Sequence, residues 1–462
     1  MENHRLESIH PEFWTKIIEI LPPQELAEYR NSLIKDPVTA VRHHLQKAGQ
    51  EFSKTEQLTV LWHPRGQQLK DRPEFSPDPY FHSGSYYVQD PSAMFLYHIL
   101  NELKRELPEN PLIADICAAP GGKSTLLLDF LEGQGLLLSN ELVPKRNAVL
   151  RDNLVKWGYL NVINSRKDPN YLKKCGAIFD LLIVDAPCSG EGMFRKSKAA
   201  RKAWSSELVV ENAKRQKNIL LDSMALIKPG GFMIYCNCTM NITENENVVL
   251  SIAERKKIMP VDIYIPEDWN IFKTKKDGFE FYRFFPHRIS GEGMTYCVFQ
   301  KENNQFTESE STYPSNLSPL SKKQKEELLK FIYPQILENG QFYLHEKGEV
   351  FYLLNDITKT SFHLINQIQA SPLPLGEFRK DLFIPSHFIV MAGLQNPQIP
   401  TLIIEKEQVR LYLKKTPFKI DTKNIGWAIV RYQDQLIGWV KIHSKGGKFT
   451  NYYPNSLRLL NY

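Results

Sequence analysis

The sequence of 462 residues predicts an α/β fold built on a mainly parallel sheet with helices on both faces. Two observations indicate this class. Segments typical of strands and helices alternate over residues 112–300, and an apolar strand at their start runs into the turn Gly121-Gly122 and then a helix opened by Ser124. Such a turn lets the backbone approach a ligand closely, with the free N–H groups of the helix facing it.

The glycine turn lacks two common nucleotide-binding motifs. Gly122-Lys123-Ser124 is similar to the end of a P-loop, but Cys117 stands where that motif has its first glycine, and no Gly-x-Gly-x-x-Gly is present. Glu141 follows the turn after about 20 residues, the usual spacing to a ribose-binding carboxylate on the second strand. The segment therefore predicts a site for an adenosine-containing cofactor; the alternative is a tight turn without a chemical role.

Residues 1–75 predict a small, separate α+β module. Apolar spacing indicates helices over 13–20 and 26–33, separated by Pro22-Pro23. The cations and aromatic residues that follow predict either a nucleic-acid surface or a solvated face: Arg42, His43, His44, Lys47, Phe52, Lys54, Trp62, His63, Arg65 and Lys70. A proline-rich joint at 73–79 then leads to a helix through Leu100 that should cover the sheet.

The main α/β domain is expected over residues 76–300. After the strand that begins at Ile113, the pattern predicts strands at 136–138, 162–163, 179–184 and 232–235, and a closing hairpin of 282–285 with 296–300. Helices are predicted from Pro144 to Gly158 and through Leu208 to Met224, with a break at 229–231. Thr243-x-x-Glu246 is typical of a capping box, so the Asn241 sequon is expected to be a helix start and not a glycosylation site.

Beyond residue 300 the composition changes. Residues 301–320 are polar and predict a linker, and 321–396 predict a small α/β module with a helix over 322–337 and strands within 341–353. Within residues 397–462, apolar and polar side chains alternate around Ile403, Val409 and Leu411, and again in 427–430 and 436–440. This alternation favours a small β-barrel. In this stretch cations are interleaved with aromatic residues, which predicts either an RNA-binding surface or the solvated rim of an ordinary barrel: Lys441, Lys445, Lys448, Tyr452, Tyr453 and Arg458.

Composition narrows the class of protein. A net charge of +6 permits an anionic partner without requiring one. Six cysteines without paired metal-ligand spacing predict neither a disulfide framework nor a metal site, which fits a reducing cytoplasm. We find no signal-peptide core and no apolar run of about 18 residues, so neither secretion nor a membrane partner is expected.

Four ordered motifs carry a family resemblance. They are Asp-x-Cys-Ala-Ala-Pro-Gly-Gly-Lys at 115–123, Asn-Glu at 140–141 with Arg146, Asp-Ala-Pro-Cys-Ser-Gly at 185–190, and Tyr-x-x-Cys-Thr at 235–239 followed by Glu-Asn-Glu. Together they resemble the Sun family of S-adenosylmethionine-dependent RNA cytosine 5-methyltransferases, over residues 84–300. The segments 191–196, 285–288 and 291–293 are most similar to its bacterial rRNA small subunit methyltransferase F branch, and 438–441 and 452–458 to the PUA-like module of that branch.

The resemblance implies a Rossmann-like methyltransferase sheet, S-adenosylmethionine as cofactor and cytosine in 16S (small-subunit) rRNA or the 30S subunit as substrate. It implies a cytoplasmic monomer that acts on neither DNA nor membranes. Cofactor contacts are expected from Cys117, Ala118, Ala119, Pro120, Gly121, Gly122, Lys123, Glu141, Asp168 and Asp185. Glu141 should hold the ribose, Asp185 should also reach the cytosine edge, and Asp168 either meets the adenine or caps a helix. Lys123, Arg195 and Lys196 are expected to contact RNA phosphate or motif backbone, or to be solvated.

Cytosine chemistry requires a thiol. Position 5 is a poor nucleophile until a thiolate adds to position 6. Cys188 and Cys238 end neighbouring predicted strands, and their spacing does not say which one attacks. The resemblance implies that Cys238 attacks and Cys188 helps to release the product. Cys236-Asn237 departs from the Ser-Thr usual in the family, and on an extended segment Cys236 would face the same way as Cys238. Two other functions of the whole protein are alternatives to the methyltransferase: a P-loop enzyme and a catalytically silent RNA-binding or ribosome-assembly protein.

Overall fold

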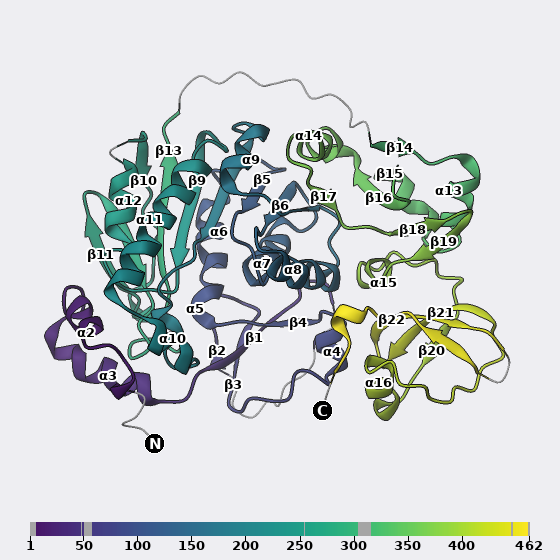
Figure 1. The fold of residues 1–462 in the computed structure, drawn as a ribbon, viewed down its shortest axis with the longest axis horizontal. Coiled ribbons are helices and arrows are strands. Elements are labelled where there is room, and N and C mark those ends of the chain that lie inside the picture. Colours follow the sequence, from purple (N-terminus) through teal and green to yellow (C-terminus); the bar gives the residue numbers. More distant parts are fainter. Residues whose placement is uncertain are drawn as a thin grey trace.

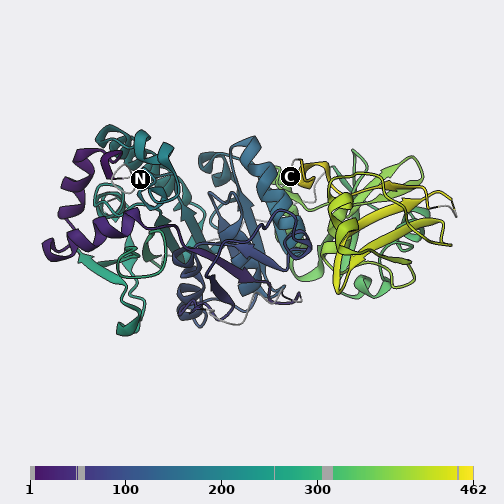
Figure 2. The same ribbon diagram turned by 90° about the horizontal axis from the view of Figure 1, so that it is seen from below.

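The computed structural model describes residues 6–47, 49, 58–253, 255–303, 316–444 and 447–460. Within these residues the strands form four sheets, the largest of ten strands. Figure 1 shows the N-terminal helices at one end of the molecule, the large sheet in the middle and the C-terminal units at the other end. The view from below in Figure 2 shows the same order, so the molecule is elongated along one axis. None of the described helices is long and apolar enough to cross a bilayer.

The two predicted N-terminal helices are confirmed as α2 (Pro11–Ile18) and α3 (Leu26–Ile34). They do not form a separate core, however. Phe13 of α2 lies edge-on to Trp204, with ring centroids 5.6 Å apart, and Tyr29 of α3 packs on Phe285 at 5.4 Å. Because these buried rings belong to one hydrophobic cluster, the helices are anchored on the larger domain.

A four-stranded antiparallel sheet follows, in the order β2 (Leu58–Thr59), β3 (Gly66–Leu69), β1 (Thr39–His43) and β4 (Tyr86–Val88). This sheet continues past residue 75, where the sequence placed a module boundary.

Several of the expected nucleic-acid cations are internal to the protein. Arg42 is fully buried, where it pairs with Asp129 and donates to Thr125 Oγ1 at 2.6 Å. His44 and His63 are also buried, and burial lowers the pKa of both. The prediction of a nucleic-acid surface is therefore wrong for these three side chains, because Arg42 bonds to the helix of residues 122–131, His44 packs on Trp157 and His63 packs on Tyr97. Phe52 and Lys54 lie outside the described residues.

The large sheet confirms the predicted parallel core. Its order is β11-β12-β13-β9-β8-β5-β6-β7-β17, where β17 is Ser371–Pro372, with β10 (Ile258–Pro260) paired to β13. The parallel strands are β5 (Leu112–Asp115), β6 (Leu136–Asn140), β7 (Val162–Ser165), β8 (Phe179–Asp185) and β9 (Ile227–Asn237). The predicted closing hairpin is β12 (Phe279–Arg283) with β13 (Thr295–Lys301), and β11 (Phe272–Lys276) extends it.

Both faces of this sheet are covered by helices. One face packs on α6 (Leu96–Leu103), α7 (Gly122–Leu131) and α8 (Pro144–Trp157). The other packs on α11 (Ser206–Ser223) and α12 (Glu246–Ala253). Successive residues of β8 alternate between the two cores, Leu181 and Ile183 on one face and Leu182 and Val184 on the other. Burial on both faces explains the continuous apolar run in the sequence.

Shorter helices connect these elements: α4 (Pro79–His82), α5 (Pro91–Met94), α9 (Pro169–Leu172) and α10 (Lys198–Ala203).

Two local predictions in this domain are wrong. The Pro-Gly-Gly at 229–231 does not precede the fifth strand but lies within β9, where the pairing with β8 shifts register and Gly230 adopts a φ of +76°. The turn before α12 is held by Asn241, whose Oδ1 accepts the Glu244 N–H at 2.8 Å, because the Glu246 carboxylate is engaged by Arg283 at 2.6 and 2.7 Å. Asn241 is fully buried, as expected of a residue that is not glycosylated.

The next unit contains β14 (Leu317–Pro319), β15 (Gly340–His345), β16 (Glu349–Leu354), β18 (Gly376–Arg379), β19 (Leu382–Pro385), α14 (Thr358–Ile368) and α15 (His387–Met391). The helix predicted over 322–337 is shorter, because α13 (Lys322–Leu328) ends well before Pro334 and Tyr333 is extended. The strand β17 (Ser371–Pro372) of this unit pairs with β7, so the unit adds a strand to the large sheet. Of the expected linker, residues 304–315 are outside the described ranges.

The last unit is a sheet of β20 (Thr401–Ile403), β21 (Gly426–Tyr432), β22 (Gln435–Ile442) and β23 (Phe449–Asn451) with α16 (Lys406–Leu413). Val409 and Leu411 lie on α16, so their alternation did not indicate a strand; a capping box of Glu405 and Gln408 starts the helix. The Tyr453 side chain is buried, and its hydroxyl is hydrogen-bonded to His82 Nδ1 at 2.6 Å. Tyr453 is therefore not part of the predicted RNA-binding surface. Lys445 is outside the described residues.

Candidate active site

The glycine turn joins the end of β5 to α7, as predicted, but its glycines serve packing. Gly121 has a φ of +113°, and a Cβ there would lie 3.2 Å from Leu150 Cδ1 of α8. A Cβ on Gly122 would lie 3.3 Å from both Tyr87 and Gln89. A Cβ at either position would therefore crowd protein side chains, and the two glycines let α8 and β4 approach the turn.

Asp115, the last residue of β5, is fully buried beneath this turn. Its Oδ2 accepts a hydrogen bond from Ser124 Oγ at 2.7 Å, while its Oδ1 has no hydrogen-bond partner among the described residues. Burial raises the pKa of this carboxyl to about 7. A buried polar atom without a partner at the carboxyl end of a parallel strand is what a polar ligand would complete.

Glu141 lies at the end of β6, the neighbouring strand. Its Oε1 accepts the Val143 N–H at 2.9 Å, and its Oε2 lies 3.3 Å from Arg146 Nη2. Arg146 also donates to the Ala119 carbonyl at 2.9 Å, so one guanidinium ties the acid to the glycine turn. The predicted ribose acid and the turn thus share one edge of the sheet.

Asp168 follows β7 and is exposed. Its Oδ1 accepts the Asn170 N–H at 2.9 Å and caps α9, which is the cap alternative of the prediction.

The two predicted thiols are brought together. Cys188 follows β8 and Cys238 follows β9, and their sulfur atoms are 3.2 Å apart. Both side chains are partly exposed. The hydrogen bond with Cys238, together with burial, raises the pKa of Cys188 well above its usual value, so Cys188 remains a protonated thiol. Two thiols in contact at the ends of adjacent parallel strands form the centre of the candidate site.

Cys236 does not share this position, contrary to the expectation for an extended segment. It lies within β9, fully buried in the core on the α7 side, and burial raises its pKa well above the usual value. Cys238 comes after the strand has ended at Asn237 and turns out of the sheet. Only Cys238 of these two thiols reaches the site.

Asp185, the last residue of β8, points to the same edge. Its Oδ2 accepts from Lys123 Nζ at 2.7 Å, and the Asp185 side chain is 34% exposed whereas that of Lys123 is 9% exposed. Burial lowers the pKa of Lys123, but the Asp185 carboxylate more than offsets this and the pKa is raised overall. Lys123 is therefore not available to RNA phosphate; it fixes the orientation of Asp185.

Glu244 is a residue of the site that the sequence did not single out. It is fully buried, and its carboxylate accepts four hydrogen bonds: from Ser189 N at 2.9 Å, Ser189 Oγ at 2.5 Å, Asn241 Nδ2 at 2.9 Å and Gln216 Nε2 at 2.9 Å. Ser189 adjoins Cys188, and Asn241 lies on the loop of Cys238. Glu244 therefore bridges the two loops that hold the thiols. Its place in the Glu-Asn-Glu motif was the available signal.

Asn237, the departure from the family pattern, is part of the same buried network. Its Nδ2 donates to Tyr235 Oη at 3.0 Å and to Asn245 Oδ1 at 3.1 Å, and its Oδ1 accepts the Thr239 N–H at 3.1 Å. The carboxamide stabilises the turn that carries Cys238 and does not enter the site.

Arg195 and Lys196 differ in accessibility. Arg195 is buried, with Nε 2.9 Å from Glu292 Oε2 and a further hydrogen bond to the Gly291 carbonyl, so it does not contact RNA. Lys196 is partly exposed, 3.5 Å from Asp90 Oδ2.

The sheet order and the strand-end site define the class as an S-adenosylmethionine-dependent methyltransferase. Residues 103–300 match the family model of the 16S rRNA methyltransferase RsmB/F, and residues 400–459 match the methyltransferase RsmF PUA domain. Residues 103–300 are therefore a methyltransferase domain of the RsmB/F family, and residues 400–459 are a PUA domain of the RsmF type.

Curated relatives and solved structures agree with this assignment. Ribosomal RNA small subunit methyltransferase F of Aliivibrio fischeri strain MJ11 is 28% identical over 79% of this chain and 78% of that protein. The human 28S rRNA (cytosine(4447)-C(5))-methyltransferase is 26% identical over 66% of this chain and 39% of its own length. The crystal structure of PH0851 has a TM-score of 0.57 at 22% identity, covering 63% of this chain and 66% of that one. NSun6 from Pyrococcus horikoshii with SFG has a TM-score of 0.53 at 18% identity, covering 65% and 100%. The similarity to these two structures supports the fold of the methyltransferase domain.

Proposed function

We propose that the protein transfers a methyl group from S-adenosylmethionine to position 5 of cytosine in small-subunit rRNA, and that Cys238 is the nucleophile. The observation that carries this proposal is the 3.2 Å contact between Cys188 and Cys238 at the edge of the sheet that also holds the glycine turn. The names of the bacterial relatives support small-subunit rRNA as the substrate. As part of the proposal, the protein acts as a monomer in the cytoplasm, on free rRNA or on the 30S subunit.

The residues present fit the cofactor. Cys117 to Gly122 would line it with their backbone, Glu141 would accept hydrogen bonds from its ribose hydroxyls, and the unpartnered Asp115 Oδ1 offers a further acceptor nearby. The exposed Asp168 Oδ2 would meet the adenine amino group. When bound, S-adenosylmethionine supplies an electrophilic methyl group.

The two thiols would divide the covalent chemistry. The Cys238 thiolate adds to position 6 of the base, which makes position 5 nucleophilic enough to take the methyl group. A water molecule then takes the proton from position 5, and the electron pair of that C–H bond expels the Cys238 thiolate from position 6. Cys188, protonated and 3.2 Å from that sulfur, donates a hydrogen bond that stabilises the departing thiolate. Asp185, held by Lys123, would accept a hydrogen bond from the amino edge of the cytosine.

The flanking units would supply RNA affinity. We divide the chain into an N-terminal module (1–75), whose helices pack on the catalytic domain and whose sheet extends to β4, the catalytic domain (76–300), a linker (301–320), a small α/β module (321–396) and the PUA-like module (397–462). Lys441 lies 5.5 Å from the ring centre of Trp427, which in turn packs on Tyr452 at 4.4 Å. This arrangement of a cation and stacked rings suits unstacked bases and phosphate.

The deciding experiment maps 5-methylcytosine on rRNA with and without the gene. In parallel, the purified chain is supplied with labelled S-adenosylmethionine and unmodified small-subunit rRNA. The expected result is one or more cytosines that lose the mark in the deletion strain and gain it in vitro. Identical maps and no transfer to rRNA would reject the function, and would favour a silent RNA-binding or assembly protein.

A further inference from the structure

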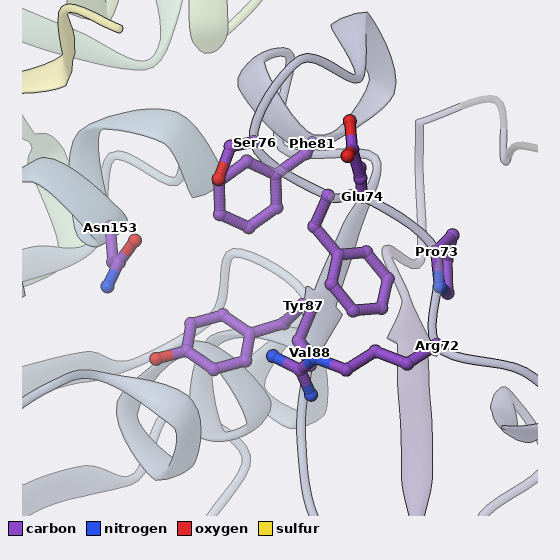
Figure 3. Close-up of a pocket in the computed structure, with 9 residues that line it drawn as sticks. Arg72, Pro73, Glu74, Ser76, Phe81, Tyr87, Val88 and Asn153 are labelled. Atoms are coloured by element: carbon purple, nitrogen blue, oxygen red, sulfur yellow. The ribbon is translucent and has the colours of Figure 1, made fainter. Parts of the chain in front are cut away.

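A pocket of about 530 Å³ lies outside the predicted cofactor contacts, lined by Arg72, Pro73, Glu74, Phe75, Ser76, Phe81, Tyr87, Val88 and Asn153. Its volume falls in the range of small-ligand sites. Figure 3 shows Phe81 and Ser76 on one side of the hollow, Tyr87 on the opposite side and Asn153 on a third. The lining therefore combines aromatic rings with a carboxamide and the exposed side chain of Arg72.

The rings that line the pocket are fixed from behind. Lys156 Nζ lies 4.2 Å from the ring centre of Phe81, and Trp157 lies edge-on to Tyr87 with centroids 6.3 Å apart. Arg72 lies 5.5 Å from the ring centre of Phe75. Because these side chains already have partners in the free protein, a flat ligand entering between Phe81 and Tyr87 would meet walls that need little ordering.

The pocket adjoins the glycine turn without coinciding with the ribose site. Asn153 Nδ2 donates to the Pro120 carbonyl at 2.8 Å, and Tyr87 is the side chain that a Cβ on Gly122 would touch. Arg146, which holds Glu141, is seven residues earlier on the same helix, about 10 Å away along the axis. A ligand in the pocket would therefore sit beside the cofactor turn, at a separate position.

The PUA-like unit reaches α8 and α4 at this place. Ser456 Oγ donates to Asp152 Oδ1 at 2.9 Å, next to Asn153, and Tyr80 Oη donates to Gln433 Oε1 at 2.8 Å, next to Phe81. The pocket thus opens where the RNA-binding type of domain meets the methyltransferase domain. Single-stranded RNA is bound by stacking its bases on aromatic side chains, with cations at its phosphates.

We infer that this pocket binds one unpaired nucleotide of the substrate RNA, with its base against the rings of Phe81 and Tyr87, the base edge at Asn153 and the backbone phosphate near Arg72. The inference rests on the proposed function, because that function makes RNA the substrate. The pocket would hold a nucleotide other than the cytosine that reacts, since the thiols follow β8 and β9, on one side of β5 in the sheet order, whereas Asn153 lies on α8, which follows β6 on the other side.

The test uses the full chain with S-adenosylmethionine and measures its affinity for a small-subunit rRNA fragment at one fixed salt concentration. Phe81→Leu removes the ring and keeps the apolar bulk, whereas Ser76→Trp fills the pocket. Each should weaken RNA binding by roughly 5- to 150-fold, the effect of one lost base stack. Tyr264→Leu removes an exposed ring outside the pocket and should leave the affinity unchanged.

Calorimetric titration with S-adenosylmethionine separates the pocket from the cofactor site, and neither pocket variant should change that affinity. If Phe81→Leu lowers the melting temperature, Ser76→Trp decides the question. Wild-type RNA affinity in Ser76→Trp, or a parallel loss of cofactor affinity, would overturn the inference. If the wild-type protein methylates rRNA and the variants bind normally, the pocket assignment alone fails. If no methylation occurs but the variants still lose RNA affinity, the proposed function fails and the pocket stands.

Discussion

Replacement of Glu244 by alanine removes the carboxylate that bridges the two thiol loops. The four donors that it accepts are buried: Ser189 N–H, Ser189 Oγ–H, Gln216 Nε2–H and Asn241 Nδ2–H. The last three keep another acceptor, on Thr239, Pro187 or Glu191, and only the Ser189 N–H has no other acceptor among the described residues. An unsatisfied buried donor costs about 1–3 kcal/mol, so the free energy of unfolding should fall by about that amount. This is a measurable share of the stability of an ordinary domain. Urea unfolding of the variant and of the wild type measures the difference.

The isosteric variant Glu244→Gln separates positioning from folding. It keeps the volume and one acceptor oxygen but presents an amide N–H to former donors, so the thiol loops should relax while the domain stays folded. A displacement of about 1 Å between reacting groups can cost about 100-fold in rate. We therefore expect kcat to fall by up to 100-fold, with the affinity for S-adenosylmethionine unchanged. Wild-type kcat in Glu244→Gln together with wild-type stability in Glu244→Ala would refute the bridging role.

Three further predictions concern charge and backbone. Burial raises the pKa of Glu244 to about 7 from 4.5. The contribution of this side chain to stability is therefore complete below pH 4.5 and is lost as the pH rises through 7. In urea titrations, the stability of the wild type relative to Glu244→Gln should fall by about 3 kcal/mol over that pH interval. Arg42→Ala leaves the buried Asp129 carboxylate without a counter-ion and should cost about 3–5 kcal/mol by the same assay, and changing both residues to apolar ones should recover only part of the loss, because Trp157 Nε1 and Tyr159 Oη then lose an acceptor. Gly121→Ala should destabilise by more than Gly133→Ala, because both glycines have positive φ but only Gly121 also meets α8; equal melting temperatures would contradict the packing explanation.

The sequence predicted the large sheet well because its signals are local. Apolar runs buried on both faces, such as β8, and helix ends fixed by Pro144 and Gly158 need no knowledge of the rest of the chain. Val409 and Leu411 show the limit, since a short alternating pattern occurs on helices as well as strands and α16 is decided by its packing.

The candidate site was predicted in its chemistry but not in its support. Parallel strands end at one edge, so Cys188 and Cys238 could be expected together. That Cys236 faces the core depends on where β9 ends, and that Glu244 bridges the loops depends on tertiary contacts between residues 28 to 55 positions apart. The pocket joins residues 72–88 to Asn153 of α8, a proximity that no local pattern encodes.

The most direct test of the central claim follows the covalent adduct between protein and RNA on denaturing gels. Cys188→Ala should still attack and methylate cytosine but release it slowly, so an adduct should accumulate. Cys238→Ala should form none, alone or combined with Cys188→Ala, because the attacking thiolate is gone. Cys236→Ala should behave as the wild type, apart from a small packing cost. An adduct that persists in Cys188→Ala with Cys238→Ala, and disappears only when Cys236 is also changed, would contradict the assignment of Cys238 as the nucleophile.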